Sequence, residues 1–170
     1  MPLSGAMLAV SAYGELTNAL DMGTGRAPQS LSKSMSLASG TGVGKADRIF
    51  SDRRTLAASA TEDLDLAGVL LDAFGAAITF ARIKGLIVAA AAGNTNNVVV
   101  GAASSNPWAT LLGSTHTLTL RPGAFVAVGT GVADAVGYAV TASTGDLLKI
   151  ANSSSGTPVT YDIHIIGASA

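Results

Sequence analysis

Alternation of apolar and polar residues at every second position is the feature that most constrains this chain. In the segment 30–37, serines occupy the even positions, while Leu31, Lys33, Met35 and Leu37 occupy the odd ones. A period of two places successive side chains on opposite faces of an extended strand. We therefore expect a strand here with one apolar face and one hydroxyl face. The same pattern predicts further strands within 78–88, 98–100, 118–120, 125–128, 136–140, 147–150 and 159–166.

Breaks rich in Gly, Asn, Ser or Pro separate these runs at intervals of roughly ten residues. Short strands at such spacing predict an all-β fold, either an antiparallel β-sandwich or a jelly-roll-like arrangement. We assign residues 29–170 to the sandwich. Residues 1–28 form a loosely patterned N-terminal segment, interpreted either as an arm that orders against a neighbour or as a pair of edge strands. Helical spacing also occurs in 64–77, but Gly68 and Gly75 disfavour a helix, so strand plus loop is expected there.

The low charge content argues against nucleic acid and anionic membranes as partners. Charged residues make up 12% of the chain, about half the usual fraction, and the net charge is −1. A net charge near zero favours association, and it creates no long-range field for nucleic acid or an anionic membrane. The longest apolar run, 85–93, is much shorter than the ~20 residues of a membrane helix. Residues 1–12 lack the basic start of a signal peptide, so we expect synthesis in a cytoplasm.

The glycine-rich segment 39–45 resembles a phosphate-binding loop only superficially. Ser39 stands where the motif needs its first glycine, and Ala46 stands where a hydroxyl must reach magnesium. An exposed linker is the better interpretation.

Two small groups of titratable residues were weighed as sites. Asp162 and His164 share one face of the last expected strand, opposite apolar neighbours, and Asp63 and Asp65 share a face of another strand. A hydrolase triad, a calcium site or a glycosidase pair would need further groups that the sequence lacks. Both pairs are therefore interpreted as solvated faces. We expect no enzyme activity, and no catalytic, cofactor-binding or metal-binding residues.

A basic cluster and the single tryptophan are the candidate interface residues: Lys45, Arg48, Arg53, Arg54 and Trp108. The cluster alternates with Asp47 and Asp52, which argues against nucleic-acid binding and favours ion pairs that dock the first segment on a partner or on the same subunit. Trp108 follows a turn and is either an interface anchor or, as we prefer, a core residue at one end of the sandwich.

Several segments resemble structural proteins of tailed bacteriophages: 16–21 (LTNALD), 40–52 (GTGVGKADRIFSD), 55–68 (TLAASATEDLDLAG), 80–84 (FARIK), 93–97 (GNTNN), 121–123 (RPG) and 159–167 (VTYDIHIIG). The resemblance covers most of the chain from about residue 14 onward. It implies a small virion protein, most plausibly a capsid decoration (cement) protein. Such proteins are commonly β-rich and often homotrimeric; they bind the major capsid protein outside the head and bridge capsomers.

Three alternatives remain beside the decoration protein. One is a tail, baseplate or head-fibre component. Another is a carbohydrate-binding attachment module, which the scarcity of aromatic residues disfavours. The last is an enzyme, for which Asp63, Asp65, Asp162 and His164 would be the first residues to test.

Overall fold

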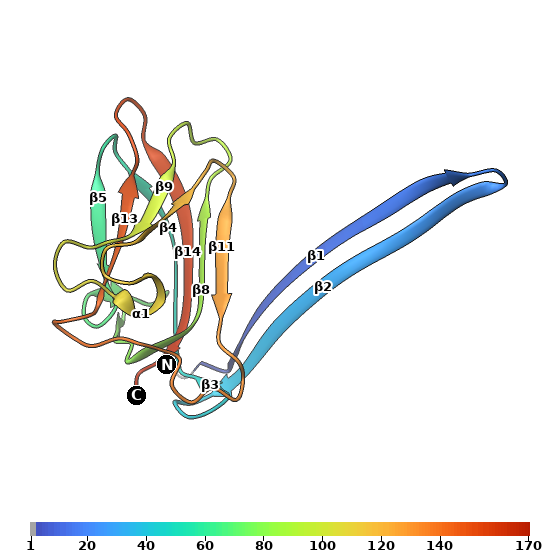
Figure 1. Cartoon of the computed structure of the whole chain (residues 1–170). Coiled ribbons are helices and arrows are strands. Elements are labelled where there is room, and N and C mark those ends of the chain that lie inside the picture. Colours follow the sequence, from blue (N-terminus) through green and yellow to red (C-terminus); the bar gives the residue numbers. More distant parts are fainter. Residues whose placement is uncertain (1–2) are drawn as a thin grey trace.

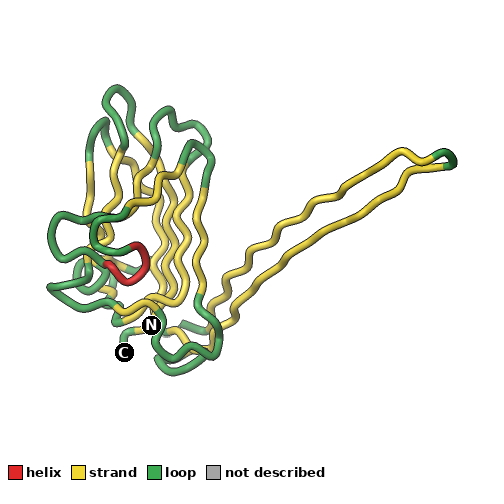
Figure 2. Tube along the Cα trace, viewed as in Figure 1, coloured by secondary structure: helices red, strands yellow, loops and turns green. Residues whose placement is uncertain are grey.

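The computed structural model describes residues 3–170 as a β-sandwich body with a long β-hairpin projecting from it (Figure 1). Strands account for 57% of the chain and helix for 2%, which confirms the expected all-β, sandwich-like fold. The loops gather at the two ends of the body (Figure 2).

Two antiparallel sheets form the body. The first has the strand order β10 (Thr117–Leu120), β9 (Val98–Gly101), β13 (Leu147–Asn152) and β5 (Thr61–Asp65). The second has the order β11 (Phe125–Gly129), β8 (Arg82–Ala90), β14 (Val159–Ala168) and β4 (Arg48–Leu56), and β12 (Tyr138–Ala139) also pairs with β8.

The antiparallel pairs are nested along the chain. The first body strand, β4, pairs with the last, β14; inside that pair lie β5 with β13, then β8 with β11, and finally β9 with β10. Most contacts in the body therefore join segments far apart in sequence, and the sandwich requires nearly the whole of 48–168 to close.

Alternate residues of both sheets fill the space between them. The inward positions include Val88 on β8, Ile150 on β13 and Ile163 on β14, all at most 2% exposed. They belong to a single core of buried apolar side chains that spans both sheets. The period-two pattern thus predicted the inward faces of β8 and β14 correctly.

A polar contact also joins the two sheets at one side of the core. Tyr161 on β14 is fully buried, and its hydroxyl donates to Glu62 Oε1 on β5 at 2.6 Å. Arg54 on β4 donates to Glu62 Oε2 at 2.8 Å through Nε. Burial and the bond to Glu62 raise the pKa of Tyr161, so its hydroxyl remains a donor. Two residues of the opposite sheet thus bind Glu62: Tyr161 on the inner strand β14 and Arg54 on the edge strand β4.

Smaller elements complete the body. The segment 64–77 contains no helix, as expected, but turns and the short strand β6 (Leu70–Leu71), which pairs with β7 (Ala77–Ile78). The helix α1 (Ala109–Leu112) was not predicted, since a single turn has no recognisable period.

The N-terminal boundary differs from the sequence-based division. β1 (Gly5–Leu20) pairs with β2 (Gly23–Ser39) along its whole length, through a turn at Asp21 and Met22. The expected boundary after residue 28 therefore falls inside β2. The strand recognised at 30–37 belongs to the projecting hairpin and not to the sandwich, because its hydrogen-bond partner is the segment that carried no clear pattern.

The contact between Tyr161 and Glu62 gives a direct test of the fold. We expect Tyr161→Phe to lower the free energy of unfolding by about 1 kcal/mol, because a half-buried carboxylate oxygen loses its donor. Urea denaturation measures the difference. Tyr138→Phe is the matched control, since its hydroxyl makes no hydrogen bond within residues 3–170; equal effects of both variants would contradict the assigned role.

Candidate assembly arm and its surroundings

The projecting hairpin β1–β2, here called the arm, is the most unusual feature of the molecule. Its strands contain 16 and 17 residues, against a usual strand length of about 5–6 residues. At about 3.3 Å per residue the ribbon is roughly 50 Å long. Beyond its base it projects away from the body (Figure 1).

The arm has one apolar face along its entire length. The cross-strand register places Leu8 opposite Met35, and Ala12 opposite Leu31, on this face. Even positions of β1 and odd positions of β2 share it: Ala6, Leu8, Val10, Ala12, Leu16 and Leu20 with Leu37, Met35, Leu31 and Ala27. Lys33, Gln29 and Asn18 are its polar members, so it carries a single charge.

Only the base of this apolar face is covered. Leu8, Met35 and Leu37 are 8%, 4% and 2% exposed, whereas Leu31 and Leu16 are 62% and 67% exposed. The same face therefore changes from core to solvent-exposed surface within the ribbon. We call the uncovered part, from Val10 to Leu20 and from Ala27 to Leu31, the distal apolar face.

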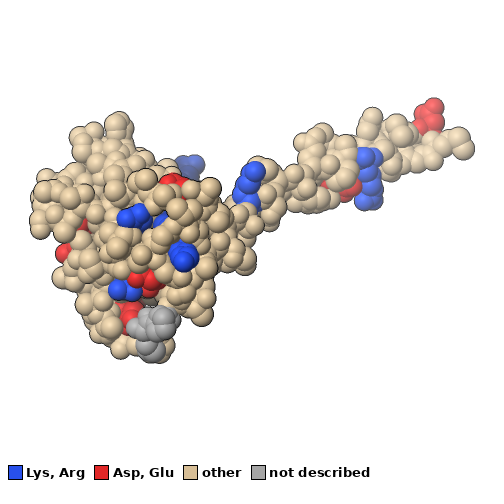
Figure 3. Space-filling model, turned by 90° about the horizontal axis from the view of Figure 1, so that it is seen from below, with Lys and Arg blue, Asp and Glu red and all other residues tan. Residues whose placement is uncertain are grey.

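The opposite face of the arm is mostly polar. Serines dominate its β2 side, and Glu15 pairs with Arg26 across the strands at 3.6 Å. Met7 and Tyr13 are its large exposed side chains. Charged residues are sparse on the arm, as the space-filling view shows (Figure 3).

A second, small hydrophobic core fixes the base of the arm to the body. Leu8, Met35 and Leu37 pack there with Ala46 and Ile166. Gly85 on β8 makes this close approach possible, since an added Cβ would lie 3.0 Å from Met35 Cε. β2 also continues into a short parallel pairing with β3 (Lys45–Ala46).

Lys84 on β8 also stabilises the connection between the arm and the body. It lies at an irregularity of the sheet, where β14 shifts register between Ile166 and Gly167, and its side chain is 1% exposed. Its ammonium donates to the carbonyl oxygens of Gly42 and Lys45, both at 2.7 Å. Burial lowers its pKa. A buried cation thus holds the loop that leads from the arm into the body.

That loop is the segment expected to be an exposed linker. Gly42 and Val43 are exposed, in agreement, but its ends are tied down by backbone bonds from Ala38 to Gly44 and from Gly40 to Ala46. The loop therefore shapes the base of the arm and is not a free connection.

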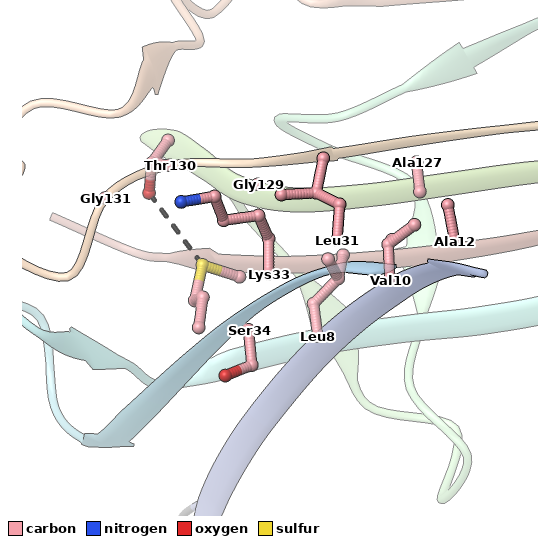
Figure 4. Close-up of a pocket in the computed structure, with 11 residues that line it drawn as sticks. Leu8, Val10, Ala12, Leu31, Lys33, Ser34, Ala127, Gly129, Thr130 and Gly131 are labelled. Atoms are coloured by element: carbon pink, nitrogen blue, oxygen red, sulfur yellow. Dashed lines mark hydrogen bonds between the residues drawn. The ribbon is translucent and has the colours of Figure 1, made fainter. Parts of the chain in front are cut away.

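A cleft of about 420 Å³ opens where the arm diverges from the body (Figure 4). One wall is the arm, with Val10, Ala12 and Leu31, and the other is the end of β11, with Ala127 and Gly129. Its lining is mainly apolar.

The basic residues predicted as interface candidates separate in the structure. Arg53 binds Asp162 at 2.6 Å on the surface, which lowers the pKa of Asp162, and Arg54 binds Asp52 and Glu62. Arg48 pairs with its neighbour Asp47. Two of these pairs, Arg53–Asp162 and Arg54–Glu62, join body strands, and none of the pairs involves residues 3–28. They therefore do not dock the first segment on the same subunit, and docking on a partner stays a prediction. Lys45 is exposed at the foot of the arm and forms no ion pair within residues 3–170.

Trp108 is a core residue. It is 5% exposed, its indole N–H donates to the carbonyl of Ala139 at 2.9 Å, and its ring meets that of Tyr138 edge to face. The interpretation as a core residue is confirmed, and the surface needed for an interface anchor is absent.

The two titratable pairs differ in their surroundings: Asp63 and Asp65 line a cleft of about 300 Å³ with Asp52 and Arg54, and Asp162 and His164 are not among the residues that line it. Asp162 is exposed and bound to Arg53, while His164, half-buried beside it, has a pKa lowered by burial. Asp63 is exposed, and Asp65 accepts a hydrogen bond from the backbone of Ala67. Within the described part of the chain, no three His, Asp or Glu side chains cluster in a way suited to a metal ion.

No helix within residues 3–170 is long and apolar enough to cross a membrane. Comparison of the chain with protein-family models, curated proteins and solved structures gave no match.

The joint at Lys84 can be tested by substitution. We expect Lys84→Met to reduce the free energy of unfolding by about 2 kcal/mol, because two carbonyl oxygens lose a charged donor in a buried position. Equilibrium unfolding in urea measures the loss. Lys149→Met is the control, since Lys149 is half-buried on β13, and it should change stability little. A Lys84 variant as stable as this control would contradict the stabilising role assigned to the Lys84 hydrogen bonds.

Proposed function

We propose that this chain is a non-enzymatic structural subunit of a symmetric assembly, and that the arm is the element that joins it to neighbours. The observation that carries the proposal is the uncovered distal apolar face. A two-stranded ribbon is only marginally stable in water on its own, and large exposed apolar patches mark interaction sites. An arm of this length gains stability when a neighbour covers it.

The way in which the titratable groups are engaged supports a structural role, and in the cleft that Asp63 and Asp65 line, Arg54 is paired with Asp52 and Glu62. Asp162 is engaged by Arg53, and Asp65 by its own turn. The one apolar cleft next to the arm is lined by Lys33 as its sole titratable residue. This cleft therefore offers a contact surface without the converging acid and base groups of an active site.

The assembly we propose is the capsid of a tailed bacteriophage, with this chain as a decoration protein. Three observations support it: the resemblance of the sequence to phage structural proteins, the low net charge, and the nested strand pairing, which is similar to that of the jelly rolls found in viral capsid domains. In this role a homotrimer would sit outside the head, bind the major capsid protein and bridge capsomers. Repetition of the contact by symmetry would make detachment cooperative.

A ring or tube in the tail is the second candidate, and the arm itself favours it. A head-to-tail contact between identical subunits generates a closed ring or an open helical stack. The number of copies per virion separates the two candidates, since decoration of a head requires far more copies than a single ring.

Polar substitutions on the distal apolar face test the proposal. The triple variant Leu16→Ser, Leu20→Ser, Leu31→Ser should bind capsids of the encoding phage at least tenfold more weakly, because it removes the apolar surface that a neighbour would cover. Co-sedimentation of the purified chain with capsids that lack it measures binding.

The control variant changes the opposite face, with Tyr13→Ser and Thr17→Ser, and should bind as the unmodified chain does. Equal binding by all three proteins would contradict a role for the distal face. Recovery of the chain from tails alone would replace the decoration role with the tail candidate.

A further inference from the structure

A second apolar surface lies on the body beside the arm. Residues of β8 and β11 alternate between the core and the outside, and Val88 and Val126 point inward. Their neighbours Ile87, Ala89 and Phe125 therefore point outward. The outward set consists of Gly85, Ile87 and Ala89 on β8 with Phe125, Ala127 and Gly129 on β11, and we call it the outer strip.

The outer strip contains no charged residue. Ile87, Ala89 and Ala127 are half-buried, and Ile87 packs against the small core at the base of the arm. Phe125, at its far end, is 62% exposed. Gly129 and Gly85, at its near end, lie under the base of the arm: an added Cβ at Gly129 would be 3.5 Å from Leu8 Cδ2. The contact between the strip and the arm is therefore made at the near end of the strip, and Phe125 at the far end is left exposed.

The base of the arm shows that these two surfaces fit each other. There, Leu8 and Met35 from the arm's apolar face pack on the small residues of the outer strip with buried contacts. Farther out both surfaces keep the same character, with branched apolar side chains on the arm and small or apolar ones on the strip. The cleft separates them because the arm diverges from β11 (Figures 1 and 4).

The arm's own subunit is poorly placed to close this gap. The second core, the pairing of β2 with β3 and the bonds of Lys84 all set the direction in which the arm leaves. A second copy offers both missing surfaces at once, since every copy has a partly exposed outer strip and an uncovered arm.

We propose that the distal apolar face of one subunit's arm packs on the outer strip of a second copy of this chain, continuing the contact that the arm's base makes within its own subunit. This inference rests on the proposed function of the arm and names its partner. Each subunit gives one arm and accepts one. The pairing is either reciprocal, which yields a dimer, or cyclic, which yields a ring such as a trimer.

Cross-linking between two single-cysteine variants tests the pairing, and the chain has no cysteine of its own to interfere. Variants with a cysteine in place of Ala12, Leu16, Leu20 or Leu31 are each mixed with F125C and treated with a short bis-maleimide. Separate tags on the two variants identify the mixed dimer, which cannot arise within one chain. Several arm positions are used so that the exact offset between arm and strip does not decide the outcome.

We expect at least one position of the distal apolar face to give tenfold more mixed dimer with F125C than Y13C or S30C, on the opposite face, gives. Replacing F125C by V69C, on a turn next to the other edge of the body, should abolish the excess. No excess from any distal position, or equal yields from both arm faces, would overturn the inference.

The same arm variants, cross-linked within assembled particles, separate this inference from the proposed function. Products joining the arm to the major capsid protein, with none joining it to a second copy, would overturn the self-pairing and leave the arm's assembly role intact. No product with any protein of the particle would contradict both.

Discussion

The apolar face of the arm, covered at its base and bare beyond it, is the constraint on which the rest of the molecule depends. Burial of Leu8, Met35 and Leu37 anchors the ribbon, while exposure of Leu16, Leu20 and Leu31 leaves the greater part of it in water. Each large apolar side chain that is buried contributes about 1.5–3 kcal/mol relative to the exposed state. The isolated chain therefore retains a substantial unused free energy of association, which a neighbour can recover.

The body is built to support this arm. Its nested strands surround an apolar core, and the polar contact around Glu62 that bridges the sheets is made by Tyr161 and Arg54. Its surface arginines are used in local pairs, which contribute little to stability when exposed. The contacts of Lys84 and Gly85 set the direction in which the arm leaves the body. In the proposed assembly, a neighbour would therefore meet the apolar face in a defined direction.

The sequence allowed the body to be predicted better than the arm. Alternation identified the strand at 30–37 and the inward faces of β8 and β14, because one side of each is apolar and the other is not. In β1 the alternation of Leu8, Val10, Leu16 and Leu20 was present but obscured, since Gly14, Asn18 and the apolar residues Met7, Ala9 and Tyr13 interrupt it. Nothing in the local pattern shows that two strands leave the body. That fact depends on which segments pair: β1 and β2 pair with each other along their whole length, and neither is hydrogen-bonded into the two sheets of the body.

Hydrogen–deuterium exchange of the arm amides, compared between the dilute purified chain and the assembled particle, tests the central claim most directly. The account predicts that peptides covering residues 10–31 exchange fast in the dilute chain and become strongly protected on assembly, while those of the β14 core stay protected in both states. Equal exchange of the arm in both states would show that no neighbour covers it, and would contradict the account.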